Sequence, residues 1–593
     1  MSDFKKFWLK EANKLNWISK PKKVFIKKKN NKNIWFPDGL INIYDNCITK
    51  NLTNLTKNKT AIIFISEEKK ILSLTYEDID NLVNHFCTYI KKYKPNSKIA
   101  MIHSSASIAS AVSMLAFSKL GIHFSVIFED LPIEAINLRI KLLKPDLLIT
   151  RSVNYSSKEL KKCLVNSNLK SSIIISSNIN EQSNGIYFYS FNKKKKYKKE
   201  HYVKSTILKS NKALFTLFTS GSTGVPKGIV HSSGGYLLYS KYTSQKQFGM
   251  NRKSVVLTAS DAGWINGHTY AFFSPLALGS TTILLEKPTI ILNCHFLEKI
   301  IKKYNISIIY LPVTLIRLMK SLIPQNKKIH NHNIKALGSM GEPLASIIAN
   351  WYSDLFFVKK KSIVNTYFQT ETGGIIASSK YNENDSKSYG TVGRPLNKFI
   401  KLNLPKIKNT NFNLELVSSW PGCMIDVLNG NSQWRKYWKN NKFQLFDFAK
   451  QDNNNRIIVE GRTDDVINIR GHRIGSGEIE AIVLKINHII EASAIAVDNE
   501  LEGSNLVIFV VTKKKKIKSK INDIIYKNFG SHALPKDIFI IKEMPKTKSG
   551  KILRRLLRNI YQSPFKKINY DISTITNKKI LDQLRSEIKN YVK

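Results

Sequence analysis

The chain has 593 residues, of which 42% are hydrophobic, and its 94 Lys and Arg against 43 Asp and Glu give a formal net charge of +51. This length permits several domains, and the composition is that of a folded chain, which excludes a disordered one. No run of about 18 apolar residues occurs, because Asp261, Asn266 and His268 interrupt the best apolar stretches, so a membrane-spanning helix is excluded as well.

The N-terminus and the cysteines indicate where the protein works. Met1-Ser-Asp-Phe-Lys-Lys lacks the apolar region of a secretory signal. The cysteines are scattered, odd in number and form no C-x-x-C pair, which argues against a disulfide framework or a zinc ribbon and suits a reducing compartment. They are Cys47, Cys87, Cys163, Cys294 and Cys423. We therefore predict a cytoplasmic protein without a membrane partner.

The positive charge would ordinarily indicate nucleic acid or an anionic membrane as the partner. The excess is mostly lysine, and Asn and Ile are abundant beside it. All three residue types have AT-rich codons, so a mutational bias accounts for them together. The densest runs, 193–199 and 513–520, contain Tyr197 as their single aromatic residue. We interpret them as solvated loops and do not expect a nucleic-acid partner.

From about residue 60 to 350, short β-rich runs alternate with segments that have apolar residues at helical spacing. Strands are predicted at 61–65, 98–103, 146–150, 172–176, 255–258 and 306–310, and helices at 106–120 and 296–304. Such alternation predicts a layered α/β architecture. The polar, lysine-rich stretch 181–212 is predicted to be a surface excursion.

The pattern changes after residue 401. Shorter strands and turns up to about 456 predict a small β-rich subdomain, and a compact α+β unit follows residue 461. In that unit we predict helices at 477–486 and 521–528 and strands at 494–497, 506–511 and 537–541. The organisation predicted is therefore a large layered domain, 1–463, and a small mobile C-terminal domain, 464–593, with a hinge at 463–465.

One loop has the composition of a phosphate-binding site. The sequence Leu217-Phe-Thr-Ser-Gly-Ser-Thr-Gly-Val-Pro-Lys-Gly-Ile-Val-His231 follows an apolar strand predicted at 213–218. Glycines let backbone N–H groups approach an anion, hydroxyls add donors, and Lys227 supplies positive charge. It is not the Walker pattern, because no Gly-Lys-Ser/Thr follows at the required spacing.

This loop resembles the phosphate-binding signature of the adenylate-forming superfamily, which includes the acyl-CoA synthetases. The further signatures follow in order at 338–343, 365–374, 446–447, 461–475 and 545–552. Two additional segments, Trp35-Phe-Pro-Asp-Gly-Leu-Ile-Asn42 and Asp261-Ala-Gly-Trp-Ile-Asn-Gly-His268, are similar to acetyl-CoA synthetases and their propionyl-CoA relatives. The resemblance covers nearly the whole chain.

The resemblance implies an enzyme that uses ATP, Mg²⁺ and coenzyme A. A carboxylate attacks the α-phosphate of ATP, giving acyl-AMP and pyrophosphate, and the thiol of coenzyme A then attacks the acyl-AMP. Between the two steps the C-terminal domain swings about Asp464, so that Lys551 leaves the site and Gly471 arrives to open a pantetheine channel. Acetylation of Lys551 would remove its charge and stop the first step, which implies acetylating and deacetylating enzymes as partners.

The resemblance also assigns the site residues. The catalytic residues are Lys551, Glu371, Thr370 and Lys227, and Glu371 shares Mg²⁺ with the phosphates. The residues assigned to ATP or AMP are Thr219, Ser220, Gly221, Ser222, Thr223, Gly224, Gly341, Glu342, Pro343, Asn365, Thr366, Tyr367, Phe368, Gln369, Asp447, Arg462 and Arg473. The acyl pocket is assigned to Ile265, Asn266, Met340 and Phe368, and the coenzyme A channel to Gly471 and Asn266.

The acyl pocket departs from the family pattern. Tyr367-Phe368 replaces a tryptophan pair, which deepens the pocket, while Met340 replaces a valine and takes space back. Asn266 replaces a threonine, and its amide can hydrogen-bond a polar acid. We predict a short-chain acid such as acetate or propionate. Tyr526 also stands where an arginine contacts coenzyme A in the family, and Asn365 stands in place of an aspartate.

Two other functions stay open from the sequence. The protein could adenylate an acid and pass it to a different acceptor, such as a carrier protein. Alternatively, it could be a basic binder of nucleic acid or anionic surfaces on a decayed synthetase scaffold. The presence of Lys227, Glu371, Asp447, Arg462, Arg473 and Lys551 argues against decay.

Overall fold

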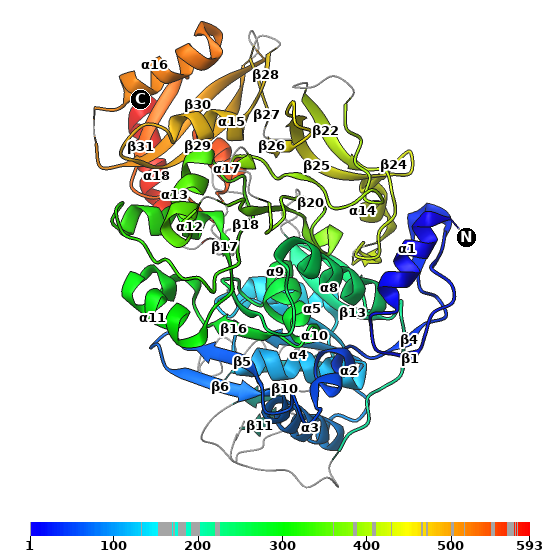
Figure 1. Ribbon diagram of the computed structural model, residues 1–593. Coiled ribbons are helices and arrows are strands. Elements are labelled where there is room, and N and C mark those ends of the chain that lie inside the picture. Colours follow the sequence, from blue (N-terminus) through cyan, green and yellow to red (C-terminus); the bar gives the residue numbers. More distant parts are fainter. Residues whose placement is uncertain are drawn as a thin grey trace.

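The computed structural model describes residues 2–131, 133–151, 169, 172–175, 186–190, 202–219, 226–359, 361–383, 388–405, 411–428, 430–463, 466–469, 472–499, 503–514, 516–546, 552–565, 575, 577 and 579–592. Two large sheets form the body of the molecule, a small β-rich subdomain lies beside them, and a C-terminal α+β unit lies at one end (Figure 1). No described helix is long and apolar enough to cross a membrane.

The first large sheet has the strand order β11-β10-β9-β7-β8-β13-β14-β23. Its strands are β7 (Ile99–His103), β8 (His123–Ile127), β9 (Leu147–Arg151), β10 (Ser172–Ile175), β11 (Ile186–Tyr189), β13 (Ala213–Thr219), β14 (Lys227–Ser232) and β23 (Asp426–Val427). The pairs from β11 to β13 are parallel, whereas β13, β14 and β23 pair antiparallel. Parallel strands buried on both faces explain their continuous runs of Ile, Leu and Val.

The second large sheet has the order β21-β20-β19-β18-β17-β15-β16-β5-β6. Its strands are β5 (Thr60–Ile65), β6 (Ile71–Thr75), β15 (Val255–Thr258), β16 (Thr281–Leu285), β17 (Ile308–Pro312), β18 (Ala336–Met340), β19 (Val364–Tyr367), β20 (Ala377–Ser378) and β21 (Arg394–Pro395). The strands from β5 to β19 in this order run parallel. Their carboxyl ends therefore meet at one edge, where open α/β sheets bind ligands.

Helices connect and cover these sheets. They are α3 (Tyr76–Tyr93), α4 (Ile108–Leu120), α5 (Ile133–Leu143), α8 (Gly234–Phe248), α9 (Ile265–His268), η4 (Thr269–Phe273), α10 (Ser274–Ala277), α11 (Cys294–Tyr304), α12 (Val313–Leu322) and α13 (Ser346–Phe356). Helix α8 contacts β14 and η4, and η4 contacts β15 and β16, so this helical layer joins the two sheets. The largest apolar core spans both sheets and this layer.

The N-terminal segment packs on the body through short elements. They are α1 (Asp3–Ala12), β1 (Trp17–Ser19), β2 (Phe25–Ile26), β3 (Ile34–Trp35), β4 (Leu40–Ile41) and α2 (Ile43–Cys47), with β12 (Leu208–Lys209) pairing β4. The β-rich subdomain consists of β22 (Asn411–Leu416), α14 (Asn431–Lys436), β24 (Trp438–Lys439), β25 (Lys442–Gln451) and β26 (Ile457–Arg462). Aromatic side chains, among them Trp8, Trp35, Trp420 and Trp434, fill the core between these parts.

The C-terminal unit has a sheet of the order β28-β27-β30-β29, with β31 added beside β30. Its elements are β27 (Val466–Ile469), β28 (His472–Gly475), α15 (Ser476–Val483), β29 (Ile489–Asn499), β30 (Gly503–Thr512), α16 (Lys518–Phe529), β31 (Asp537–Ile541), α17 (Arg554–Gln562) and α18 (Lys579–Val592). Two apolar clusters cover the two faces of this sheet. The unit contacts the body where α12 meets β29 and α15 meets β26.

The structure confirms the α/β class with a small α+β C-terminal unit, and each predicted strand and helix exists. The helix predicted at 477–486 ends earlier, at Val483, and the strand at 494–497 is part of the longer β29. The surface excursion predicted for 181–212 is wrong for β11 and β12, where Tyr189 and Leu208 are buried. Polar residues flank these short apolar runs, so the average composition of residues 181–212 did not reveal them. The domain boundary at 463–464 stays a prediction.

Candidate active site

The candidate site lies where two neighbouring parallel strands of the second sheet end. Strand β18 ends at Met340 and β19 ends at Tyr367, and the two strands are hydrogen-bonded neighbours. The chain continues directly into Gly341 after β18 and into Phe368 after β19. This topology therefore brings the predicted adenine segment and the predicted central motif together.

The predicted phosphate loop joins β13 to β14 of the other sheet. Thr219, the last residue of β13, pairs in register with Lys227, the first residue of β14, so the loop is closed by an antiparallel hairpin. Residues 220–224 lie outside the described residues. Burial lowers the pKa of Lys227, Glu371 opposes this shift, and the nearby cations Lys436, Arg462 and Arg555 lower it further.

Backbone contacts hold the loop that carries Thr370 and Glu371. His231 Nε2 lies 2.7 Å from the carbonyl oxygen of Thr370, and the N–H of Met424 donates a 2.9 Å hydrogen bond to the carbonyl oxygen of Glu371. Gly373 has φ +68°, and a Cβ there would meet the carbonyl oxygen of Gly422 at 2.2 Å. A side chain at this position would thus displace the turn.

Tyr437 links the two charged residues of this loop region. Its hydroxyl donates a 2.7 Å hydrogen bond to Glu371 Oε1, and Lys227 Nζ lies 3.4 Å from the same hydroxyl. Tyr437 is 2% exposed, and burial together with the Glu371 carboxylate raises its pKa above the usual range. Glu371 and Lys227, predicted as catalytic residues, therefore both contact the Tyr437 hydroxyl.

Asp447 and Arg462 are brought together by strand pairing. They face each other in the antiparallel register of β25 and β26, with Arg462 Nη1 3.6 Å from Asp447 Oδ1. Asp447 Oδ2 accepts hydrogen bonds from the Tyr367 hydroxyl (2.5 Å) and from Gln369 Nε2 (2.6 Å). Burial and Asp447 raise the pKa of Tyr367 well above its usual range. The predicted ribose carboxylate is thereby fixed by two residues of the central motif.

In the predicted adenine segment, Gly341 has free space around its backbone, whereas the Glu342 side chain is held by an ion pair. Gly341 has φ +90° and a Cβ there would meet nothing within 4 Å, so this backbone is accessible to a ligand. Arg317 Nη1 on α12 donates a 2.8 Å hydrogen bond to Glu342 Oε2, and both side chains are buried. Pro343 follows at intermediate exposure.

Asn365 and Thr366 are buried and already bonded within the protein. Asn365 Oδ1 accepts from the Ser339 hydroxyl (2.9 Å) and Nδ2 donates to the Thr391 carbonyl (2.7 Å). The Thr366 hydroxyl donates to the Ser339 carbonyl (2.8 Å). Both residues hold β19 against β18 and the following loop, and their contact with adenine stays a prediction.

The residues predicted for the acyl pocket are mostly buried. Ile265, Asn266 and Met340 are 5–6% exposed, whereas Phe368 is partly exposed. Phe368 and Met340 belong to one apolar cluster, and the Phe368 ring packs edge-on against Tyr270 at 5.6 Å. The structure thus brings Phe368 and Met340 together at the ends of β19 and β18.

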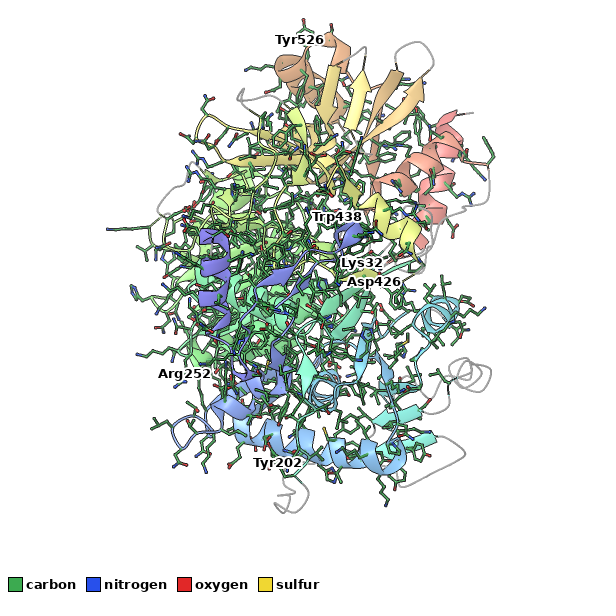
Figure 2. All side chains as sticks on the ribbon, turned by 90° about the vertical axis from the view of Figure 1, so that its right-hand side faces the viewer. Lys32, Tyr202, Arg252, Asp426, Trp438 and Tyr526 are labelled. Atoms are coloured by element: carbon green, nitrogen blue, oxygen red, sulfur yellow. The ribbon has the colours of Figure 1, made fainter. Side chains whose placement is uncertain are left out.

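Of the C-terminal unit, helix α17 is the element whose charge acts on this site. Arg555, in the first turn of α17, lies close enough to Lys227 to lower its pKa. Lys551, Gly471 and Asp464 lie outside the described residues. Arg473 lies in β28, which Figure 1 shows at the outer end of the C-terminal unit, away from α17. Tyr526 is 60% exposed on α16, and Figure 2 shows it at the outer end of the same unit.

Reasoning from the sequence missed four residues of this site, namely Tyr437, Lys436, Arg317 and Arg555. The first two follow no recognised motif, and the signal in their neighbourhood is only a mixed basic and aromatic stretch, 434–438. Arg555 belongs to the basic run 546–555, which in isolation is typical of a solvated tail. Their roles depend on which distant segments pack together.

Three known protein-family models match this chain. The AMP-binding enzyme family matches residues 50–406, its C-terminal domain matches 478–551, and the acetyl-coenzyme A synthetase N-terminus matches 1–47. The chain belongs to the AMP-binding enzyme family. Relatives that match nearly its whole length include acetyl-coenzyme A synthetases, and its class of reaction is the AMP-forming ligation of an acid to coenzyme A.

Full-length relatives support this placement. The acetyl-coenzyme A synthetase of Leptospira biflexa is 31% identical over 99% of this chain and 94% of its own length, and acetyl-coenzyme A synthetase 1 of Saccharomyces cerevisiae is 29% identical over 98% and 87%. Among solved structures, acetoacetyl-CoA synthetase from Streptomyces lividans matches with a TM-score of 0.81 at 16% identity, over 99% of this chain and 93% of that one. These relatives do not favour a carrier-protein acceptor or a non-enzymatic binder.

Proposed function

We propose that this protein ligates a short-chain carboxylic acid, acetate or propionate in size, to coenzyme A through an acyl-adenylate. In the first step a carboxylate oxygen attacks the α-phosphorus of ATP and pyrophosphate leaves with the electron pair of the broken P–O bond. In the second step the thiolate of coenzyme A attacks the acyl carbon and AMP leaves. No electrons are gained or lost overall.

The observation that carries this proposal is the charge arrangement around Glu371. Glu371 and Lys227 both contact the Tyr437 hydroxyl. The cations Lys436, Arg462 and Arg555, from three other segments, lower the pKa of Lys227. Such an excess of cations suits a polyphosphate, because phosphoryl transfer is promoted by neutralising charge on the phosphate oxygens. Asp447, fixed by Tyr367 and Gln369, provides carboxylate oxygens that can accept from ribose hydroxyls.

Mg²⁺ fits this site as an ion shared with the phosphates. Among the described residues no group of three or more His, Cys, Asp or Glu could hold a metal alone. Glu371 offers one carboxylate at the phosphate side, and Mg²⁺ is commonly bound by one or two carboxylates together with substrate phosphates. When bound there, it would neutralise phosphate charge, and Glu371 would hold it in place.

The position of α17 supports assignment of this conformation to the first step. Arg555 acts on Lys227, and Lys551 precedes it by only four residues. We assign Lys551 to the bond between the acid and the α-phosphate, and Asp464, Gly471 and Arg473 to the rotated arrangement of the second step. Acetylation of Lys551 would then block only the first step.

The test is AMP formation from ATP and Mg²⁺ with coenzyme A and acetate, propionate or butyrate. The wild-type protein should release AMP with the short acids, and Lys551→Ala should abolish it. Lys485→Ala, an exposed lysine of the same C-terminal unit, is the matched control and should keep wild-type activity. A wild-type rate in Lys551→Ala, or no AMP with any acid from folded protein, would contradict the proposal.

A further inference from the structure

One residue predicted for the acyl pocket has a buried side-chain amide whose two polar atoms are unpaired among the described residues. Asn266 is 5% exposed, and neither its Nδ2 nor its Oδ1 has a hydrogen-bond partner in the described part of the chain. Leaving both ends of an amide desolvated and unpaired is costly, so buried amides are nearly always bonded. By contrast, both ends of the buried Asn365 amide are bonded, Oδ1 to the Ser339 hydroxyl and Nδ2 to the Thr391 carbonyl.

The helix that carries Asn266 determines which way this side chain faces. Asn266 is the second residue of the continuous helical run α9–η4–α10, and Tyr270 follows it by four residues, about one turn later on the same face. The Tyr270 ring packs edge-on against Phe368 at 5.6 Å. Asn266 therefore lies on the helix face that looks toward Phe368 and the end of β19. His268, by contrast, packs against Phe215 on the first sheet at 4.5 Å between ring centroids.

The other residues predicted for the acyl pocket are apolar. Ile265, Met340 and Phe368 offer no hydrogen-bonding side chain, and the Tyr270 hydroxyl is occupied by the N–H of Ile375 and by Thr243. An acid with a purely hydrocarbon tail would leave the Asn266 amide unpaired when it displaces water from this pocket. An acid with a hydroxyl group on its tail would complete the amide's hydrogen bonds.

We infer that the acid substrate carries a hydroxyl group on its short tail, and that Asn266 selects for it. This inference deepens the proposed function and rests on it. A site built to bond a polar group discriminates strongly against an analogue that lacks it, because the buried group is then left unpaired. The pantetheine arm of coenzyme A also carries amide and hydroxyl groups that could bond the Asn266 amide. Coenzyme A takes part only in the second half-reaction, so a measurement of the first half-reaction alone reads the acid and not coenzyme A.

The experiment is ATP–pyrophosphate exchange without coenzyme A, which reads the acid alone. Two pairs of acids differ by exchange of a methyl for a hydroxyl group, namely propionate against glycolate and butyrate against 3-hydroxypropionate. The wild-type protein should use at least one hydroxy acid about tenfold or more better, in kcat/KM, than its hydrocarbon partner. Asn266→Leu, of similar size but unable to hydrogen-bond, should lose or reverse that preference.

Two further readouts keep the test decisive. Asn266→Leu should melt no lower than the wild type, because it removes an unpaired buried amide, and Asn266→Thr should keep part of the preference. Equal use of both acids in each pair by the wild type, or an unchanged preference in Asn266→Leu, would overturn the inference. So would an effect of Asn266→Leu that is seen only after coenzyme A is added. No exchange with any acid would overturn the proposed function itself, and this inference with it.

Discussion

The Tyr437 hydroxyl donates a 2.7 Å hydrogen bond to the carboxylate of Glu371, although 66 residues separate them. Tyr437 follows α14, which the N-terminal segment holds in place. The Trp434 indole donates to the carbonyl of Asn30 at 2.6 Å, and Lys32 pairs with Asp426 at 2.8 Å (Figure 2). The N-terminal segment therefore supports the site from a distance.

Tyr437→Phe should lower kcat about 10- to 100-fold with a smaller change in KM for the acid. The variant removes a hydrogen bond to a partly buried charged group, and hydrogen bonds to charged groups contribute about 1.5–3 kcal/mol. Steady-state AMP formation at several Mg²⁺ concentrations would measure the loss. Tyr304→Phe on α11 is the matched control. Equal kcat for Tyr437→Phe and the wild type would contradict a positioning role for this phenol.

Tyr367→Phe should raise KM for ATP several-fold and leave kcat less affected. The Tyr367 hydroxyl donates to Asp447 Oδ2, and a phenylalanine would remove this bond while the contacts of the carboxylate with Gln369 and Arg462 remain. Initial rates with ATP and with 2′-deoxy-ATP would show whether the effect acts through the ribose. If the loss is the same for both nucleotides, the effect does not act through the 2′-hydroxyl; an unchanged KM for ATP would contradict the prediction.

Arg317→Leu should destabilise the large domain by about 3–5 kcal/mol, because it leaves the Glu342 carboxylate buried without its partner. The double variant Arg317→Leu with Glu342→Gln should recover part of the stability, since it removes the unpaired charge. Urea unfolding without nucleotide would measure both. A double variant that is no more stable than the single one would show that the loss comes from packing and not from the charge.

Glu460 should make stability fall as pH rises from about 5 to 8. It is 1% exposed, Lys450 lies 2.8 Å away in β25, and Glu478 of α15 shares that lysine at 2.9 Å. Burial raises the pKa of Glu460 to about 7, with Glu478 adding to the rise and Lys450 opposing it. The folded state thus binds the proton more tightly than the unfolded state, and the resulting stability is lost as pH rises through 7.

Glu460→Gln cannot lose a proton and should remove this dependence. Its melting temperature minus that of the wild type should increase from pH 5 to pH 8, which corresponds to about 1–3 kcal/mol. Melting curves of both proteins across this range make the comparison, since all other titrating groups are shared. Parallel curves would contradict the raised pKa.

The sequence by itself determined the elements and the family. Apolar periodicity is local, so it located strands such as β5, β7 and β31 and helices such as α4 and α11. The motifs are continuous stretches, so they could be recognised one by one, from Thr219 to Lys551. Even the pairing of Asp447 with Arg462 is close to local, because one hairpin brings them together.

Tertiary structure alone decided which distant side chains meet. Tyr437 bonds Glu371 and Arg317 bonds Glu342, and the charge of Arg555 acts on Lys227, only because separate domains and helices pack in one particular way. The unpaired amide of Asn266 has the same origin. Whether a polar group is bonded depends on every neighbour within about 3 Å, and no local pattern in the sequence specifies those neighbours.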